Sequence, residues 1–227
     1  MAWFFGSDSD TPSNPCGNDF YMGREGYGTT PSELWTLPSG STEKACPYWN
    51  IVGPTDRPSG TTPTQWGRDQ AAAFWTYYSH HGIPSGTGLL NLFGSISRGS
   101  GGWTAGNYGP NRSVVDGFLN ELHTLSASSG KRLGLYGAQT FEFQTLLDAS
   151  SWSSPQPIVV WIAVPYEGTP RNCSGVESAY CPMPTVGGYF PMIWQYHQVT
   201  PDDYDITPYE GFKTNGYWTP TDPPGIC

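Results

Sequence analysis

Short apolar runs recur along the chain and alternate with segments of helical periodicity. Runs of four to seven mostly apolar residues predict β-strands at 3–6, 20–23, 50–53, 89–93, 132–137, 157–163, 190–196 and 204–207. Helices are expected at 65–81, 113–129 and 140–147. In the first of these, Ala71, Phe74, Trp75 and Tyr78 recur at the i, i+3, i+4, i+7 spacing of one helix face.

The segment 157–163 is an almost unbroken apolar run, which indicates a strand buried on both faces, as in parallel sheets. Strands and helices alternate, so the pattern predicts an α/β fold. We expect a small irregular (β/α) barrel, similar to a TIM barrel, formed by residues 1–227 as a single domain. An open doubly wound sheet is the alternative. No Gly-rich phosphate loop follows the first strand, which disfavours a nucleotide-binding version of that sheet.

Composition excludes two classes of partner. The net charge is -9 and no basic residues cluster, so the electrostatic footprint of a nucleic-acid-binding protein is missing. No apolar run approaches 18 residues, so no membrane span is expected. Aromatic residues make up 15% of the chain and include 10 Trp. Abundant flat rings with few charges favour a carbohydrate-binding surface, although the same rings also serve as core.

The five cysteines predict an oxidising, secreted or extracellular setting, with a reduced cytosolic protein as the alternative. Cys173 and Cys181 bracket a short loop, and Cys16 and Cys46 bracket another irregular stretch, so these are the two expected disulfides. Cys227 is left over. The four His lie far from the cysteines and no CxxC pair exists, so we expect no metal and no cofactor.

Several strand ends resemble those of glycoside hydrolase family 25, the secreted lysozymes (N-acetylmuramidases) with a compact β/α barrel. The matching blocks run nearly end to end: 5–10 with its acidic residues, 20–26 with Arg24-Glu25-Gly26, 51–54, the Gln-Ala pair in 69–74, 133–137, 160–163, Trp194-Gln195-Tyr196, and Asp205. The order and spacing of the last four blocks is the specific part. The resemblance implies a lysozyme-like barrel whose active site lies at the strand ends.

The fourth strand departs from the family pattern. The family carries Asp-x-Glu at the end of this strand, and the Glu is its expected proton donor. Here Asn91 stands at the position of the Asp and Phe93 at that of the Glu. Three explanations remain open: a shifted alignment, catalysis by other carboxylates, or a protein that no longer hydrolyses sugars.

Glycosidic bond cleavage normally needs two carboxyl groups, which in a barrel lie at the carboxyl ends of strands. Asp8, Asp10, Glu25 and Asp205 have this placement and are the predicted catalytic residues. Glu167 and Asp56 are weaker candidates. For each acid the alternative is structural, such as a turn cap at Asp8 and Asp10, or a solvent-exposed ion pair between Glu25 and Arg24.

Aromatic and amide side chains at other strand ends predict the substrate-binding surface. The predicted binding residues are Trp103, Tyr136, Trp161, Trp194, Gln195 and Tyr196. Trp103 lies in a Gly-rich loop, where an exposed ring suits a lid or subsite. Filling of the space between strands and helices is the alternative for the Trp residues.

Three functions follow in order of preference. The first is a secreted lysozyme- or muramidase-type glycoside hydrolase that cuts β-1,4 bonds in peptidoglycan or a related aminosugar polymer. The second is a protein that binds a polysaccharide or cell-wall glycan on the same barrel without cutting it. The third is self-association in a surface assembly, with Cys227 linking chains.

Overall fold

The computed structural model describes residues 4–7, 20–32, 44–80, 91–129, 131–163, 185–199 and 202–207. For β1, β9 and the last residues of β8 it describes the backbone alone. The strands are β1 Phe4–Ser7, β2 Phe20–Tyr27, β3 Thr30–Pro31, β4 Lys44–Ile51, β5 Asn91–Ile96, β6 Arg132–Ala138, β7 Ile158–Ala163, β8 Pro191–Val199 and β9 Asp202–Thr207. The helices are α1 Pro63–His80 and α2 Tyr108–Ser126, with short helical turns η1 Pro54–Asp56 and η2 Arg98–Ser100 and a π-helix η3 Gln139–Leu146.

In the described part of the chain the strands form one nine-stranded sheet in the order β1-β9-β8-β7-β6-β5-β4-β2-β3. Strands β2 and β4 to β8 pair in parallel, and β9 is antiparallel to both β8 and β1. β1 also pairs with β2, through Gly6↔Phe20 and Ser7↔Tyr21, so the pairing returns to its start. The fold is the predicted irregular (β/α) barrel, because an open doubly wound sheet has no such seam.

Two expected elements differ from the structure. The third strand was expected at 50–53 but runs over Lys44–Ile51, since Pro47 lies inside it and proline normally argues against a central strand. The second helix was expected to begin at Ser113 but starts at Tyr108. Pro110 falls in its first turn, where the missing N–H costs no hydrogen bond.

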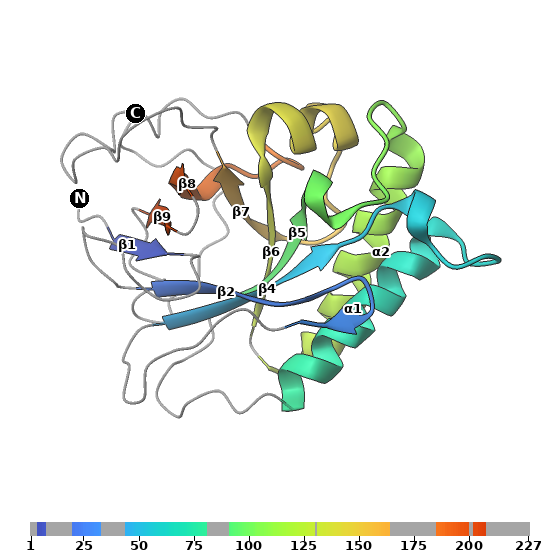
Figure 1. The fold of residues 1–227 in the computed structure, drawn as a ribbon, viewed down its shortest axis with the longest axis horizontal. Helices are drawn as coiled ribbons and strands as arrows, with labels where there is room; N and C mark the ends of the chain where they lie inside the picture. Colours follow the sequence, from blue (N-terminus) through green and yellow to red (C-terminus); the bar gives the residue numbers. More distant parts are fainter. Residues whose placement is uncertain are drawn as a thin grey trace.

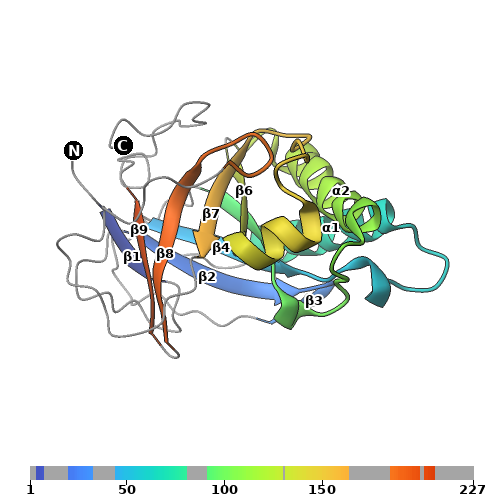
Figure 2. The ribbon, with the colours of Figure 1, turned by 90° about the horizontal axis from the view of Figure 1, so that it is seen from above.

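Helices α1 and α2 lie together on one side of the strands, and β1, β8 and β9 lie on the opposite side (Figures 1 and 2). Two glycines let the helices approach closely. A Cβ atom at Gly67 of α1 would collide with the carbonyl oxygen of Val114, and one at Gly117 of α2 would collide with that of Thr64. The helix pair therefore packs backbone against backbone at this crossing.

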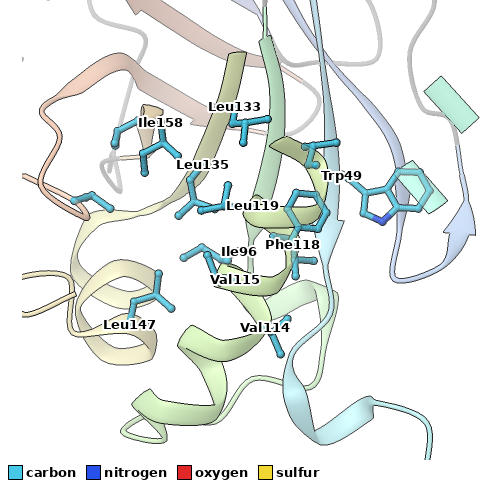
Figure 3. Packing of buried hydrophobic residues seen from close by; sticks show 14 of the residues in the cluster. Trp49, Ile96, Val114, Val115, Phe118, Leu119, Leu133, Leu135, Leu147 and Ile158 are labelled. Atoms are coloured by element: carbon cyan, nitrogen blue, oxygen red, sulfur yellow. The ribbon is translucent and has the colours of Figure 1, made fainter. Parts of the chain in front are cut away.

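The sheet separates two apolar clusters, because side chains alternate between its faces. The helix-side cluster joins Trp49, Ile96, Leu133 and Leu135 of the strands to the apolar faces of both helices (Figure 3). The inner cluster comes from strands only: Phe20, Met22, Cys46, Phe93, Val159, Trp161, Met192 and Ile193, with Tyr48 and Tyr136 packed against it. The inner cluster fills the barrel.

Side chains from α1 and from the loop between η2 and α2 hold the carboxyl end of β4. The Gln70 side chain is fully buried and brackets Val52: its Oε1 accepts from the Val52 N–H at 2.7 Å, and its Nε2 donates to the Val52 carbonyl at 3.1 Å. Trp66 Nε1 donates to the same carbonyl at 3.0 Å, and Trp103 Nε1 donates to the Ile51 carbonyl at 3.1 Å. The backbone that leaves β4 is thereby fixed.

We expect Gln70→Ala to lower the free energy of unfolding by about 2 kcal/mol, because it leaves the buried Val52 N–H without its acceptor. Gln65→Ala is the matched control on the same helix, since Gln65 is exposed and its side chain donates to the Asp69 carboxylate at the surface. Urea unfolding followed by fluorescence measures both. Equal losses in the two variants would contradict this role of Gln70.

Candidate functional site

A row of polar and aromatic residues crosses the inner face near the carboxyl ends of β2, β4, β5 and β6. Strand pairing aligns Tyr27 with Asn50, Asn50 with Ser95, and Ser95 with Tyr136. Trp49 stacks on Phe74 of α1 at 5.4 Å, so the next residue, Asn50, faces the barrel interior. Paired residues share a face, so the whole row faces inward. We call Tyr27, Asn50, Ser95 and Tyr136 the rim row.

Solvent reaches three of the four rim-row residues, and Ser95 is 1% exposed. Tyr27 is 47% exposed, and Asn50 and Tyr136 are half-buried. One step deeper, Phe93 is fully buried, whereas Arg24 and Tyr48 are half-buried, and two steps deeper Cys46 is fully buried. In the described residues, apolar side chains therefore close the barrel interior, and the rim row lies at the carboxyl ends of the strands, where barrel enzymes carry their sites.

Trp161 is the centre of the seal. Its ring contacts Tyr136 at 4.0 Å, Phe93 at 5.7 Å and Tyr48 at 5.8 Å between centroids, the last two edge to face. It is fully buried. Of the other predicted binding residues, Trp194 is buried with the helix-side cluster, and Trp103 is partly buried against the same cluster. Their faces lie against protein atoms, and their role in binding sugars stays a prediction.

Strand β5 brings no carboxylate to the site. Phe93 is buried against Trp161, and a Cβ at Gly134 would collide with its ring, so phenylalanine fills this position completely. Asn91 is 4% exposed at the start of the strand. No Asp or Glu occurs anywhere between Gln70 and Val115, so no shift of the alignment restores an acid on this strand.

Gln195 of β8 joins the rim row to the strand that carries Asp205. The Tyr136 hydroxyl donates to Gln195 Oε1 at 2.7 Å, and Gln195 is 1% exposed. The backbone of Asp205 pairs with Gln195 on one side and with Gly6 of β1 on the other. Asp205 thus occupies a ladder position between β8 and β1. Asp8 and Asp10, which follow β1 in sequence, lie outside the described residues, as does the Tyr196 side chain.

Glu25 lies on the helix side of β2. The register of β2 against β4 shifts between Arg24 and Gly26, so Glu25 is the extra residue of a β-bulge. It is fully buried, which excludes the solvent-exposed ion pair with Arg24. Burial raises the pKa of Tyr78 on α1, and the negative charge of Glu25 raises that pKa further. The Glu25 carboxylate therefore acts toward α1, and its catalytic role stays a prediction.

The remaining described acids have structural partners or lie in solvent. Glu142 Oε2 accepts from the Ala138 N–H at 3.0 Å, just after β6. Asp116 of α2 accepts from Trp152 Nε1 at 3.0 Å, and burial raises its pKa. Asp56 is exposed in η1. Glu167 lies outside the described residues.

The expectations on metals and cysteines are tested only in part. In the described ranges no group of three or more His, Cys, Asp or Glu residues is placed to hold a metal ion. Cys46 is buried on β4, and the other four cysteines lie outside those ranges, so both disulfides stay predictions. No described helix has the length and apolar character needed to cross a membrane.

Solved structures with a similar fold are lysozymes and muramidases. A family GH25 lysozyme from Aspergillus fumigatus is 17% identical with a TM-score of 0.56, over 91% of this chain and 94% of that one. A muramidase from Trichobolus zukalii is 18% identical with a TM-score of 0.55, over 88% and 89%. The autolysin LytC of Streptococcus pneumoniae, solved with a synthetic peptidoglycan ligand, is 9% identical with a TM-score of 0.50, over 83% and 40%.

These likenesses show a GH25-like fold and confirm the resemblance drawn from the strand-end motifs. No protein-family model matches the sequence, and no curated protein matches it significantly.

Sequence reasoning missed four residues that the structure places on the inner face toward the rim: Arg24, Tyr27, Asn50 and Ser95. The signal for Asn50 and Ser95 is present in the sequence, because each lies two residues after an inward-facing residue of its strand. The bulge at Glu25 hid Tyr27, since it shifts the alternation by one residue.

We expect Phe93→Glu to lower the free energy of unfolding by about 3 kcal/mol or more, because it places a carboxyl group in the sealed interior without a partner. Phe93→Leu keeps an apolar side chain and is expected to cost only about 1 kcal/mol. Chemical denaturation at pH 7 compares them. A stable Phe93→Glu protein would show that position 93 belongs to the solvated site and not to the seal.

Proposed function

We propose that this protein is a secreted glycoside hydrolase of the lysozyme or muramidase type, which hydrolyses β-1,4 bonds in peptidoglycan or a related aminosugar polymer. The observation that carries the proposal is the GH25-like barrel with β9 paired beside β1, the strand that leads into Asp8 and Asp10. This pairing supports a meeting of acids from the two ends of the chain at one edge of the rim.

Asp205 and one of Asp8 or Asp10 are the proposed carboxyl pair. One carboxyl protonates the leaving oxygen, and the other stabilises or attacks the sugar cation. Gln195 supports this assignment because it is the ladder partner of Asp205 and Tyr136 fixes its side-chain oxygen. A fixed amide next to the proposed acids is suited to orienting a sugar hydroxyl or a carboxylate.

The proposed location outside the cell is supported by the five cysteines, of which Cys16 stands beside Pro and Gly in the sequence, as is common in disulfide-bonded secreted proteins. The proposed substrate, a cell-wall glycan, also lies outside the cell. Disulfide-linked self-association through Cys227 stays a prediction, which mass measurement with and without reductant tests.

A second function, glycan binding without cleavage, is favoured by one observation. The strand that carries Asp-x-Glu in family 25 has no acid here, and the side chain at position 93 is part of the barrel seal. A barrel that keeps the rim row without enough carboxyl groups would retain its glycan and release no product.

We expect purified protein to release reducing ends from peptidoglycan, and Asp205→Asn to lower that rate by about a hundredfold or more, the scale of losing one acid–base group. Asp202→Asn, at the start of the same strand, is the matched control and should leave the rate within a few-fold. If the wild-type protein sediments with peptidoglycan but releases no reducing ends, glycan binding without cleavage replaces hydrolysis.

A further inference from the structure

Arg24 places a positive charge on the inner face of β2. It pairs with Tyr48 of β4, whose ring packs against the inner cluster, and it alternates with Phe20 and Met22 of the same cluster. The residue is half-buried, and its Nε atom is buried without a hydrogen-bond partner. In the described parts of the chain no carboxylate forms an ion pair with it.

This arrangement is costly, because a guanidinium N–H that is buried away from water needs an acceptor. Glu25 is next in sequence, but the bulge turns it toward α1 and Tyr78. Arg112 shows the usual solution: it donates to the Leu147 and Asp148 carbonyls and pairs with the Asp148 carboxylate. An unsatisfied buried donor in a folded protein points to a missing partner.

Tyr27 stands on the same face as Arg24, at the exposed end of β2. Among the described residues, Tyr27 and Tyr108 are the exposed large hydrophobic side chains. The backbone around Tyr27 is rigid: the Gly28 N–H donates to the Asn50 carbonyl at 3.0 Å, and Trp49 Nε1 donates to the Gly28 carbonyl at 2.8 Å. A Tyr ring on a fixed backbone gives contact area at low entropic cost.

We propose that Arg24 and Tyr27 form a subsite for a carboxylate-bearing unit of the glycan, with Arg24 pairing with the carboxylate and Tyr27 stacking on the sugar ring. Guanidinium groups match carboxylates in geometry and charge, and the half-buried setting strengthens the pair. Asn50, the ladder partner of Tyr27, adds an amide for sugar hydroxyls. The subsite rests on the proposed function and names its substrate class as an acidic glycan.

The carboxylate has two sources in peptidoglycan, the lactyl group of muramic acid in peptide-free glycan and the stem peptide. Three probes separate them. The first is an N-acetylglucosamine oligomer without carboxylates, and the second is a peptide-free oligomer of equal length that alternates N-acetylglucosamine and N-acetylmuramic acid. The third is this second oligomer carrying stem peptides. Calorimetric titration of the full chain with each probe gives its affinity. The probe that wild-type protein prefers identifies the source.

We expect wild-type protein to bind one acidic oligomer about tenfold more tightly than the neutral one, the scale of one charge-assisted hydrogen bond at a partly exposed site. Arg24→Gln should remove this preference and keep the affinity for the neutral oligomer. Arg24→Lys should keep part of the preference, because the charge stays while the planar fork is lost. Tyr27→Ala should weaken all three probes by about tenfold, and Tyr27→Phe should not.

Matched controls lie elsewhere on the surface: Arg68→Gln on α1 removes an exposed arginine, and Tyr108→Ala removes the other exposed tyrosine. Both should bind like wild type.

Equal wild-type affinity for acidic and neutral oligomers, or a preference that survives Arg24→Gln, overturns the subsite even if reducing ends are released. Lack of binding to every probe together with lack of product overturns the proposed function itself. Circular dichroism confirms that each variant is folded.

Discussion

The packing of Trp161 inside the barrel is the constraint on which the site depends. Tyr48, Phe93 and Tyr136 surround its ring, and each comes from a different strand. Buried aromatic rings of this kind contribute heavily to stability through their large apolar area and their edge-to-face contacts. Because these rings fill the barrel at the level of the rim row and one step below it, a ligand meets the barrel at that end, where Arg24, Tyr27, Asn50 and Tyr136 are at least partly exposed.

The same packing accounts for the side chain at position 93. A residue that seals the barrel must be large and apolar, and a proton donor must reach solvent and substrate. Gly134 leaves the space that the Phe93 ring occupies, so the neighbouring strand is adapted to the ring. The departure from the Asp-x-Glu pattern is therefore part of a coordinated core and not an isolated substitution.

Periodicity was sufficient to predict the barrel and insufficient to predict its inner surface. The unbroken apolar run in β7 and the amphipathic face of α1 depend on local composition, so their placement could be predicted. The orientation of β2 depends on a bulge of one residue at Glu25, which has no local signature. The bulge also hides Tyr27, which alternation without the bulge would place on the helix side and which the structure places on the inner face.

Asp205 could be predicted from the resemblance, but its ladder position could not. It lies one two-residue step beyond the level of Tyr136 and Trp161, because Ala163 pairs with Gln195 and Gln195 with Asp205. Since β9 runs antiparallel to its neighbours, the sequence before Asp205 leads toward the solvated end of the barrel. The proposed carboxyl chemistry is then centred on the β1–β9–β8 side of the rim, next to β2, because β1 pairs with both β9 and β2. Arg24 and the proposed acids that follow β1 thus belong to neighbouring strands, and a positive charge close to a carboxyl group favours its ionised form, the form that stabilises or attacks the sugar cation.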